Sequence, residues 1–155
     1  SDSEIFNIFL GENIDLLNIE WIYRGIKFYN LVPEELINYT LPNGLALDYK
    51  ELKKLCYGSI EDLKIYVSKT KYKELVNEEK DLDLFMEIRI QRHLFNTFKN
   101  SFKRGKLDVS ISIAYLHLLE FEIKDIISIL EAKKYGLSYY DTKEYLVRTI
   151  KGSDE

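Results

Sequence analysis

Residues 18–31 read NIEWIYRGIKFYNL, and their apolar side chains recur with the period of an α-helix. Ile19, Ile22 and Ile26 follow one another at spacings of three and four residues, so they share one face of a helix. Aromatic residues between them add apolar surface that such a face can bury. We therefore predict the first strong helix from about Ile14 to Asn30.

A second stretch repeats this pattern later in the chain, where residues 125–137 read DIISILEAKKYGL. Both stretches show a polar residue, Ile-x-x-Ile, and then a charged residue, a small residue, Lys, an aromatic residue and a closing Leu, with one extra residue in the first copy. Both run into a short predicted helix, at Pro33 and at Ser138. The offset of about 106 residues predicts a pseudo-repeat whose unit is a small helical bundle. Chance similarity between two amphipathic helices is the alternative that this match leaves open.

Helix start signals predict three shorter helices in the first half of the chain. Pro33 fits a first helical turn, and the acids after it favour the positive end of the helix dipole. Pro42-Asn43-Gly44 signals a turn. Two capping boxes then open a helix to about Tyr57 and another over Ile60 to Ser68. They are formed by Asp48 with Glu51 and by Ser59 with Asp62.

The longest periodic segments follow a polar connection at Asn77 to Lys80. The first has a narrow apolar stripe of Leu84, Ile88, Phe95, Phe98 and Phe102. Gly105 ends this helix and Asp108 caps the next one. On one side of that next helix, which we expect to be its buried side, lie Leu116, Leu119, Ile123, Ile126, Ile127 and Leu130.

The end of the chain predicts one more helix and completes an all-α fold of helical bundles. Gly136 suits the position just after a helix end, and Ser138 with Asp141 starts the last helix. That helix is expected to pack Tyr145, Leu146 and Ile150. We expect one bundle over residues 1–76 and a second, with a long helical hairpin, over residues 81–155. The two can pack as one compact unit.

Composition excludes several classes of function. The formal net charge of −4, from 26 acidic and 22 basic residues, gives no general attraction to nucleic acid or anionic lipid. Cys56 is the only cysteine, so an intrachain disulfide is impossible and a reducing compartment is expected. The longest charge-free apolar stretch, Val109 to Leu119, is shorter than the about 20 residues that span a bilayer. The chain starts at Ser1 rather than Met, so we expect a piece of a longer protein.

Catalytic patterns are missing from the sequence. No phosphate loop or dinucleotide fingerprint is present. His93 and His117 have no ligand spacing with each other or with the cysteine, so we expect partly buried structural roles for them. Glu120 and Glu122 point to different faces of a helix and cannot form an acid/base pair, whereas Glu120 can reach Lys124. We therefore expect no catalytic residues, no metal and no cofactor.

Several segments, in order along the chain, resemble the C-type subunit of V/A-type rotary ATPases, which is called the d-type subunit in the eukaryotic V-ATPase. Asp15-Leu16-Leu17-Asn18-Ile19 followed by Ile22-Tyr23-Arg24 is similar to that family's Asp-x-x-Asn-Ile-x-x-Ile-x-Arg element. Ile113-Ala114-Tyr115-Leu116, then residues 120–126, and then Lys133-Lys134-Tyr135-Gly136-Leu137 resemble its C-terminal elements. The positions that carry the resemblance are Asp15, Asn18, Arg24, Lys27, Glu120, Glu122, Asp125 and Lys133.

The sequence departs from the family pattern at two positions. Asp125 stands where the family usually has Asn, and Glu131 stands where Arg or Gly is common. Both replacements keep a helix-compatible residue. Any hydrogen bond that the usual side chains make is therefore in question, while the helix itself is not.

The resemblance implies a non-catalytic rotor subunit. Members of the family consist of three helical bundles arranged as a funnel on the cytoplasmic face of the proteolipid ring, where the funnel receives the central stalk. This chain would be the C-terminal half, with the middle and last bundles. The implied partners are the central-stalk axle subunits, the proteolipid ring and other ATPase subunits, with no nucleic acid and no transmembrane segment of its own. The implied location is cytoplasmic and peripheral on the membrane, and the implied role is coupling for ion transport or ATP synthesis. A stand-alone helical scaffold or adaptor is the alternative.

Overall fold

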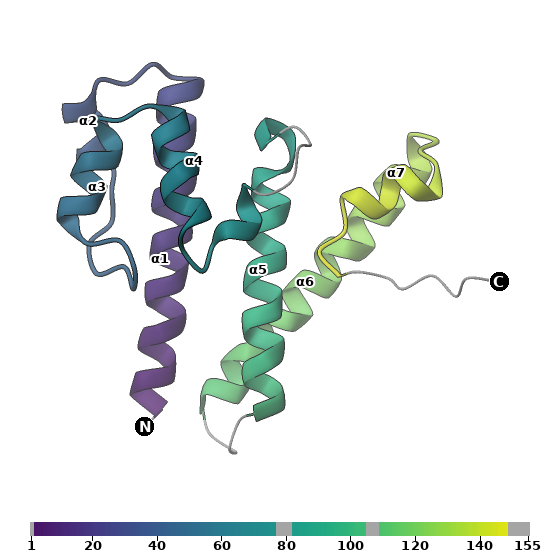
Figure 1. Ribbon diagram of the computed structural model, residues 1–155. Coiled ribbons are helices and arrows are strands. Elements are labelled where there is room, and N and C mark those ends of the chain that lie inside the picture. Colours follow the sequence, from purple (N-terminus) through teal and green to yellow (C-terminus); the bar gives the residue numbers. More distant parts are fainter. Residues whose placement is uncertain (1, 77–81, 105–108, 149–155) are drawn as a thin grey trace. The chain divides into compact units, whose positions relative to one another are not determined.

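The computed structural model describes residues 2–76, 82–104 and 109–148, and no strand occurs in these ranges (Figure 1). The elements are α1 (Asp2–Lys27), α2 (Pro33–Asn38), α3 (Tyr49–Cys56), α4 (Ile60–Ser68), the 3₁₀-helix η1 (Lys73–Leu75), α5 (Leu82–Arg104), α6 (Val109–Lys134) and α7 (Tyr139–Glu144). The predicted all-α class is confirmed. The chain divides into two compact units, Ser1–Met86 and Glu87–Glu155.

Helix α1 of unit 1 begins about three turns earlier than predicted and ends sooner, at Lys27 rather than Asn30. Gly11 interrupts the apolar pattern in the first turns of α1, so the periodicity did not predict that the helix begins at Asp2. The glycine is tolerated because α1 passes close to the later chain: a Cβ at Gly11 would lie 3.2 Å from the Cβ of Leu45. At the other end, Asn30 takes a left-handed φ of 48°, which stops the helix.

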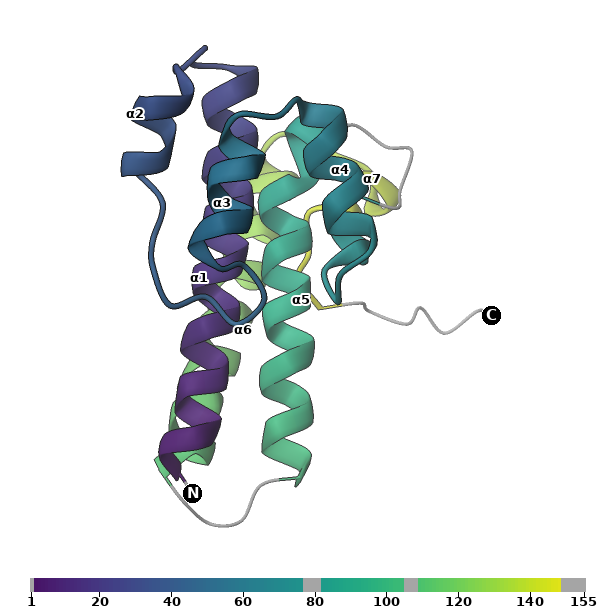
Figure 2. The ribbon, with the colours of Figure 1, turned by 60° about the vertical axis from the view of Figure 1, so that its left-hand side comes forward.

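The three short helices of unit 1 form as predicted. Asp48 caps α3 by accepting a hydrogen bond from the Glu51 amide at 2.8 Å. Ser59 and Asp62 form the reciprocal capping box of α4. Helices α2 and α3 lie side by side next to α1, and α4 also packs on α1 (Figure 1 and Figure 2). The core between them contains Leu16, Ile19, Ile22, Leu36, Leu52, Leu55, Leu63 and Val67.

In unit 2, α5 and α6 form an antiparallel helical hairpin. Ring contacts fix the register of the two helices. The ring centroids of Phe95 and Phe121 are 6.2 Å apart, and those of Phe98 and His117, which form a stacked pair, are 4.5 Å apart. Later residues of α5 therefore face earlier residues of α6. The predicted helix end at Gly105 and cap at Asp108 lie outside the described residues, as does the connection at 77–80.

The prediction for the buried side of α6 is wrong. The six predicted residues do share one side, but five of them are exposed and Leu119 is only half-buried. The buried residues of α6 are Ala114, Phe121, Asp125 and Ala132. Helix α6 has apolar side chains on more than one side, and periodicity does not say which side meets α5. The α5 stripe is likewise buried only in part, since Phe98 is buried while Leu84 and Phe102 are exposed.

The turn from α6 into α7 follows the prediction closely. Gly136 has a left-handed φ of 70°, and the amide of Leu137 donates to the Ala132 carbonyl at 2.9 Å. Ser138 then caps α7 through the Asp141 amide, and Figure 1 shows α7 folded back along the end of α6. Of the side chains expected to pack here, Leu146 is buried but Tyr145 is exposed. Ile150 lies outside the described residues.

Candidate functional site

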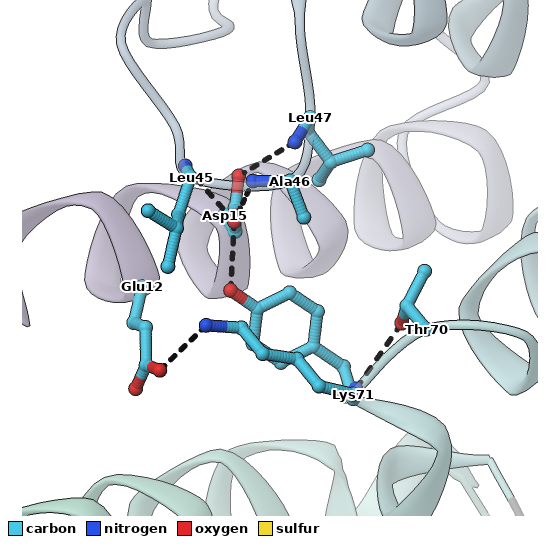
Figure 3. A network of polar contacts seen from close by, with 8 residues as sticks. Glu12, Asp15, Leu45, Ala46, Leu47, Thr70 and Lys71 are labelled. Atoms are coloured by element: carbon cyan, nitrogen blue, oxygen red, sulfur yellow. Dashed lines mark hydrogen bonds and ion pairs between the residues drawn. The ribbon is translucent and has the colours of Figure 1, made fainter. Parts of the chain in front are cut away.

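The first candidate site is a carboxylate that α1 buries beneath a loop. Asp15 is completely buried and accepts four hydrogen bonds. Its Oδ2 receives the amides of Leu45 at 3.1 Å and Ala46 at 2.7 Å, together with the Tyr72 hydroxyl at 2.7 Å. Its Oδ1 receives the amide of Leu47 at 3.1 Å. Figure 3 shows these three consecutive backbone amides gathered around one side chain.

The loop can reach Asp15 because of its turn residues. Asn43 takes a left-handed φ of 68°, in the turn that the sequence predicts at residues 42–44. A Cβ at Gly44 would overlap Oδ1 of Asp15, so only glycine permits this approach. The segment has no regular secondary structure, and Asp15 supplies the acceptors that its buried amides require.

Asn18, one turn further along α1, binds the start of the same loop. Its Oδ1 accepts from the Leu41 amide at 2.8 Å, and its Nδ2 donates to the Leu41 carbonyl at 2.9 Å. The next residue, Pro42, has no backbone N–H to offer. Asp15 and Asn18 together are called the first anchor.

Residues that follow α4 close the first anchor from another side. Lys71 forms an ion pair with Glu12 at 2.5 Å, one turn before Asp15. The Thr70 hydroxyl accepts from the Tyr72 amide at 3.1 Å (Figure 3). Burial raises the pKa of Tyr72, and its hydrogen bond to Asp15 raises that pKa further. Tyr72 therefore stays a neutral hydrogen-bond donor in the folded protein.

The second candidate site occupies the paired position on α6. Asp125 is buried, and its Oδ1 accepts from the Val147 amide at 2.7 Å. Its Oδ2 accepts from the amide of Arg148 at 3.1 Å and from the Nε of the same residue at 2.9 Å. Glu122 accepts from the other end of the guanidinium at 3.0 Å. These bonds, with Asp125 first, raise the pKa of Arg148. Glu122 and Asp125 are called the second anchor.

Arg92 of α5 completes the attachment of α7. Its Nε donates to the Leu146 carbonyl at 3.0 Å, and its Nη2 donates to the Glu144 carbonyl at 2.9 Å. A cation at this place also complements the partial negative charge at a helix C-terminus. Neither Arg92 nor Arg148 stands out in the sequence, because no local motif marks a side chain whose partners are distant carbonyls or carboxylates.

The two anchors correspond in order and spacing. Asn18 and Asp125 are paired positions of the two matched stretches, as are Asp15 and Glu122. Asn18 binds the backbone of a residue 23 positions downstream, and Asp125 binds one 22 positions downstream. The difference equals the extra residue of the first stretch. In each case a short helix, α2 or α7, lies between the anchor and the segment that it binds.

The same geometry explains why position 125 carries Asp where the paired position 18 carries Asn. Asn18 uses its N–H₂ group on the Leu41 carbonyl because Pro42 brings no donor. Asp125 instead meets Arg148, which brings a backbone N–H and a guanidinium that both need acceptors. A carboxylate satisfies both and pairs with the cation.

The other four motif residues lie on the surface. Arg24 pairs with Glu20 at 3.3 Å, and Lys27 with Asp83 at 3.5 Å. Glu120 pairs with Lys124 at 3.2 Å, as expected, and with His117 at 3.4 Å. These two bonds, with Lys124 first, lower the pKa of Glu120. Lys133 borders a cleft of about 290 Å³ between α6 and α7, which Ile129, Leu137, Tyr139, Thr142, Lys143 and Leu146 also line.

Both anchors have a structural role: they hold segments of the chain in place by hydrogen bonds. The oxygens of Asp15 and Asp125 are occupied by donors of the chain itself. Within the described residues, no three His, Cys, Asp or Glu side chains gather as a metal site would require. Burial raises the pKa of Cys56 to about 11, which keeps its thiol protonated near neutral pH.

A comparison with protein families decides the identity. The family model described as ATP synthase (C/AC39) subunit matches residues 1–145, which include both anchors. The chain belongs to the ATP synthase (C/AC39) subunit family. Neither the curated proteins nor the solved structures gave a match.

Membership in the C/AC39 family makes the protein a subunit of a V/A-type rotary ATPase. The family is an accessory subunit of that complex and not its catalytic subunit. Its partners are accordingly other subunits of the same complex. Among the helices in the described ranges, none has both the length and the apolar character needed to cross a bilayer.

Proposed function

We propose that this C/AC39 protein is a non-catalytic rotor part that couples the central stalk to the membrane proteolipid ring. It would act during ATP-driven ion transport or ATP synthesis, held on the cytoplasmic side through its partners. The observation that carries the proposal is the family match over residues 1–145. The anchors support it, because a part that transmits torque must resist deformation.

Each anchor holds a segment that has no secondary structure and so makes that segment resist deformation. Leu45, Ala46 and Leu47 belong to no helix, yet all three amides are held by Asp15. Val147 and Arg148 are held by Asp125 in the same way. Buried hydrogen-bond networks of this kind fix one geometry, because any displacement leaves buried donors without partners.

The correspondence of the anchors also supports the proposal of two copies of one repeat. The first copy would be the middle bundle of the family at residues 1–76, and the second the last bundle at residues 81–155. Paired anchor residues, paired short helices and paired bound segments all follow the offset that the sequence match predicts. Two unrelated amphipathic helices have no reason to bind segments at distances downstream that differ only by the extra residue of the first stretch.

A binding titration tests the rotor role. Central-stalk subunits of the cognate ATPase are titrated into the chain, and heat or fluorescence anisotropy measures the affinity. We expect saturable binding, which Asp15→Ala weakens because the loop loses its fixed geometry. Asp48→Ala, which removes an exposed helix cap, is the control and should bind as the unchanged chain does. Absence of saturable binding would contradict the proposal.

A further inference from the structure

The exposed side of α6 is an apolar surface that the anchors leave unused. Leu116, Ile123 and Leu130 are 64%, 57% and 62% exposed, and Ile126 and Ile127 are about half exposed. These residues follow one another at helical spacing over four turns, so they form one continuous stripe. Contiguous apolar patches of this extent on a protein surface usually mark an interaction site.

The same side of α1 is covered in unit 1. The paired positions of Leu116, Leu119, Ile123, Ile126 and Leu130 are Phe9, Glu12, Leu16, Ile19 and Tyr23, and all five are buried. The chain itself reaches this side, since Lys71 binds Glu12 and the Tyr23 hydroxyl binds Asp83. Helix α4 packs on α1 as well. In the first copy, side chains that follow α4 and that begin α5 therefore reach this surface.

Charge at the end of the stripe indicates what the occupant carries. In unit 1, Asp83 at the start of α5 also pairs with Lys27 at 3.5 Å. The paired position of Lys27 is Lys134, at the C-terminal end of the α6 stripe. Lys134 makes no ion pair within the described residues, and its ammonium lies 5.7 Å from the Tyr135 ring. An acidic side chain of an occupant would pair with it as Asp83 pairs with Lys27.

We propose that the α6 stripe (Leu116, Ile123, Ile126, Ile127 and Leu130) binds an amphipathic helix of a partner protein. That helix would place apolar residues at three- and four-residue spacing on the stripe and an acidic residue beside Lys134. The inference rests on the two-copy proposal and not on the rotor role. A chain that fails to bind stalk subunits can therefore still bind such a helix.

The test uses the full chain and two labelled synthetic peptides, each with three heptads that carry leucine at the first and fourth positions. One peptide has glutamate at both ends and the other has lysine. Fluorescence anisotropy should show binding of the glutamate-ended peptide, weakened about tenfold or more by Ile123→Glu and by Leu130→Glu, because each buries a charge in the contact. Ile65→Glu, at an equally exposed isoleucine of α4 (54%), is the matched control and should leave binding unchanged.

Reversal of charge tests the end of the stripe. Lys134→Glu should weaken the glutamate-ended peptide and strengthen the lysine-ended one, each by about two- to fivefold. Circular dichroism confirms that each variant is folded, and having two stripe variants guards against the failure of one. Absence of peptide binding, or equal weakening by Ile65→Glu, would overturn the proposal. Sedimentation of the chain alone supplies a further criterion: a dimer that Ile123→Glu dissociates would make the occupant a second copy and not a partner helix.

Discussion

Both anchors bind the backbone of a downstream segment, but they do so with different donors. At the first, Asp15 is fully buried and every donor is a backbone amide or a tyrosine. At the second, Asp125 is buried but its partner Arg148 and the neighbouring Glu122 are partly exposed, at 37% and 46% of their side-chain surface. The residue that follows Leu41 or Val147, which is Pro42 or Arg148, decides whether an amide fits at position 18 or a carboxylate at position 125. An amide at position 18 and a carboxylate at position 125 can therefore fill the same structural role.

Removing each carboxylate should give the largest losses of stability, and the size of the loss should differ between the two anchors. We expect Asp15→Ala to lower the free energy of unfolding by about 3–5 kcal/mol, because four donors lose their acceptor. Asp125→Ala should cost about 2–3 kcal/mol, since the guanidinium of Arg148 can turn to water. Urea denaturation followed by circular dichroism measures both. Equal losses would show that the openness of the second anchor has no energetic consequence.

Exchanging the two side-chain types should be the next largest effect. Asn18→Asp should cost about 2–3 kcal/mol, because a carboxylate would face the Leu41 carbonyl with no cation beside it. Asp125→Asn should cost about 1–2 kcal/mol, because Arg148 loses its charged partner. Asn96→Asp, at an exposed position of α5, is the control and should change little. If Asn18→Asp were the milder exchange, the assigned role of Pro42 would be wrong.

Alkaline pH should weaken the first anchor and spare the second. Unfolded tyrosine ionises near pH ~10, whereas burial raises the pKa of Tyr72 in the folded protein. The stability that this shift contributes is present below pH ~10 and is lost as pH rises toward the folded pKa, at up to about 1.4 kcal/mol per pH unit. Tyr72→Phe should remove this component from stability curves measured between pH ~9 and ~11, and Tyr140→Phe, at an exposed tyrosine, should not. Identical curves for both variants would contradict the assignment.

The exposed side of α6 should give the smallest effects. Ile123→Ala and Leu130→Ala should each change the free energy of unfolding by less than about 1 kcal/mol, because more than half of each residue's surface stays in contact with water. Glu122→Ala should likewise cost well under about 1 kcal/mol, since its bond to Arg148 is half exposed. Leu16→Ala, at the buried counterpart of Ile123, should cost about 2–5 kcal/mol. A loss of that size at Ile123 in urea denaturation would mean that the stripe is buried in solution.

Part of the candidate site could be predicted and part could not. The matched stretches and the family elements marked Asp15, Asn18, Glu122 and Asp125, all of which the structure places in anchors. They could not mark Tyr72, Arg92 or Arg148, because these meet their partners only after the chain has folded back. The pattern equally gave no sign that Arg24 would lie on the surface, whereas the pairing of Glu120 with Lys124 was predicted.

Local signals by themselves determined most of the helices, although not the early start of α1, because caps and turns depend on residues only a few positions apart. The capping box at Ser59, the left-handed turn at Gly136 and the start of α2 at Pro33 all formed as predicted. The choice of the buried side of α6 was left to the tertiary structure. Helix α6 carries apolar residues on opposite sides, and only contact with the aromatic rings of α5 decides which of them leaves water.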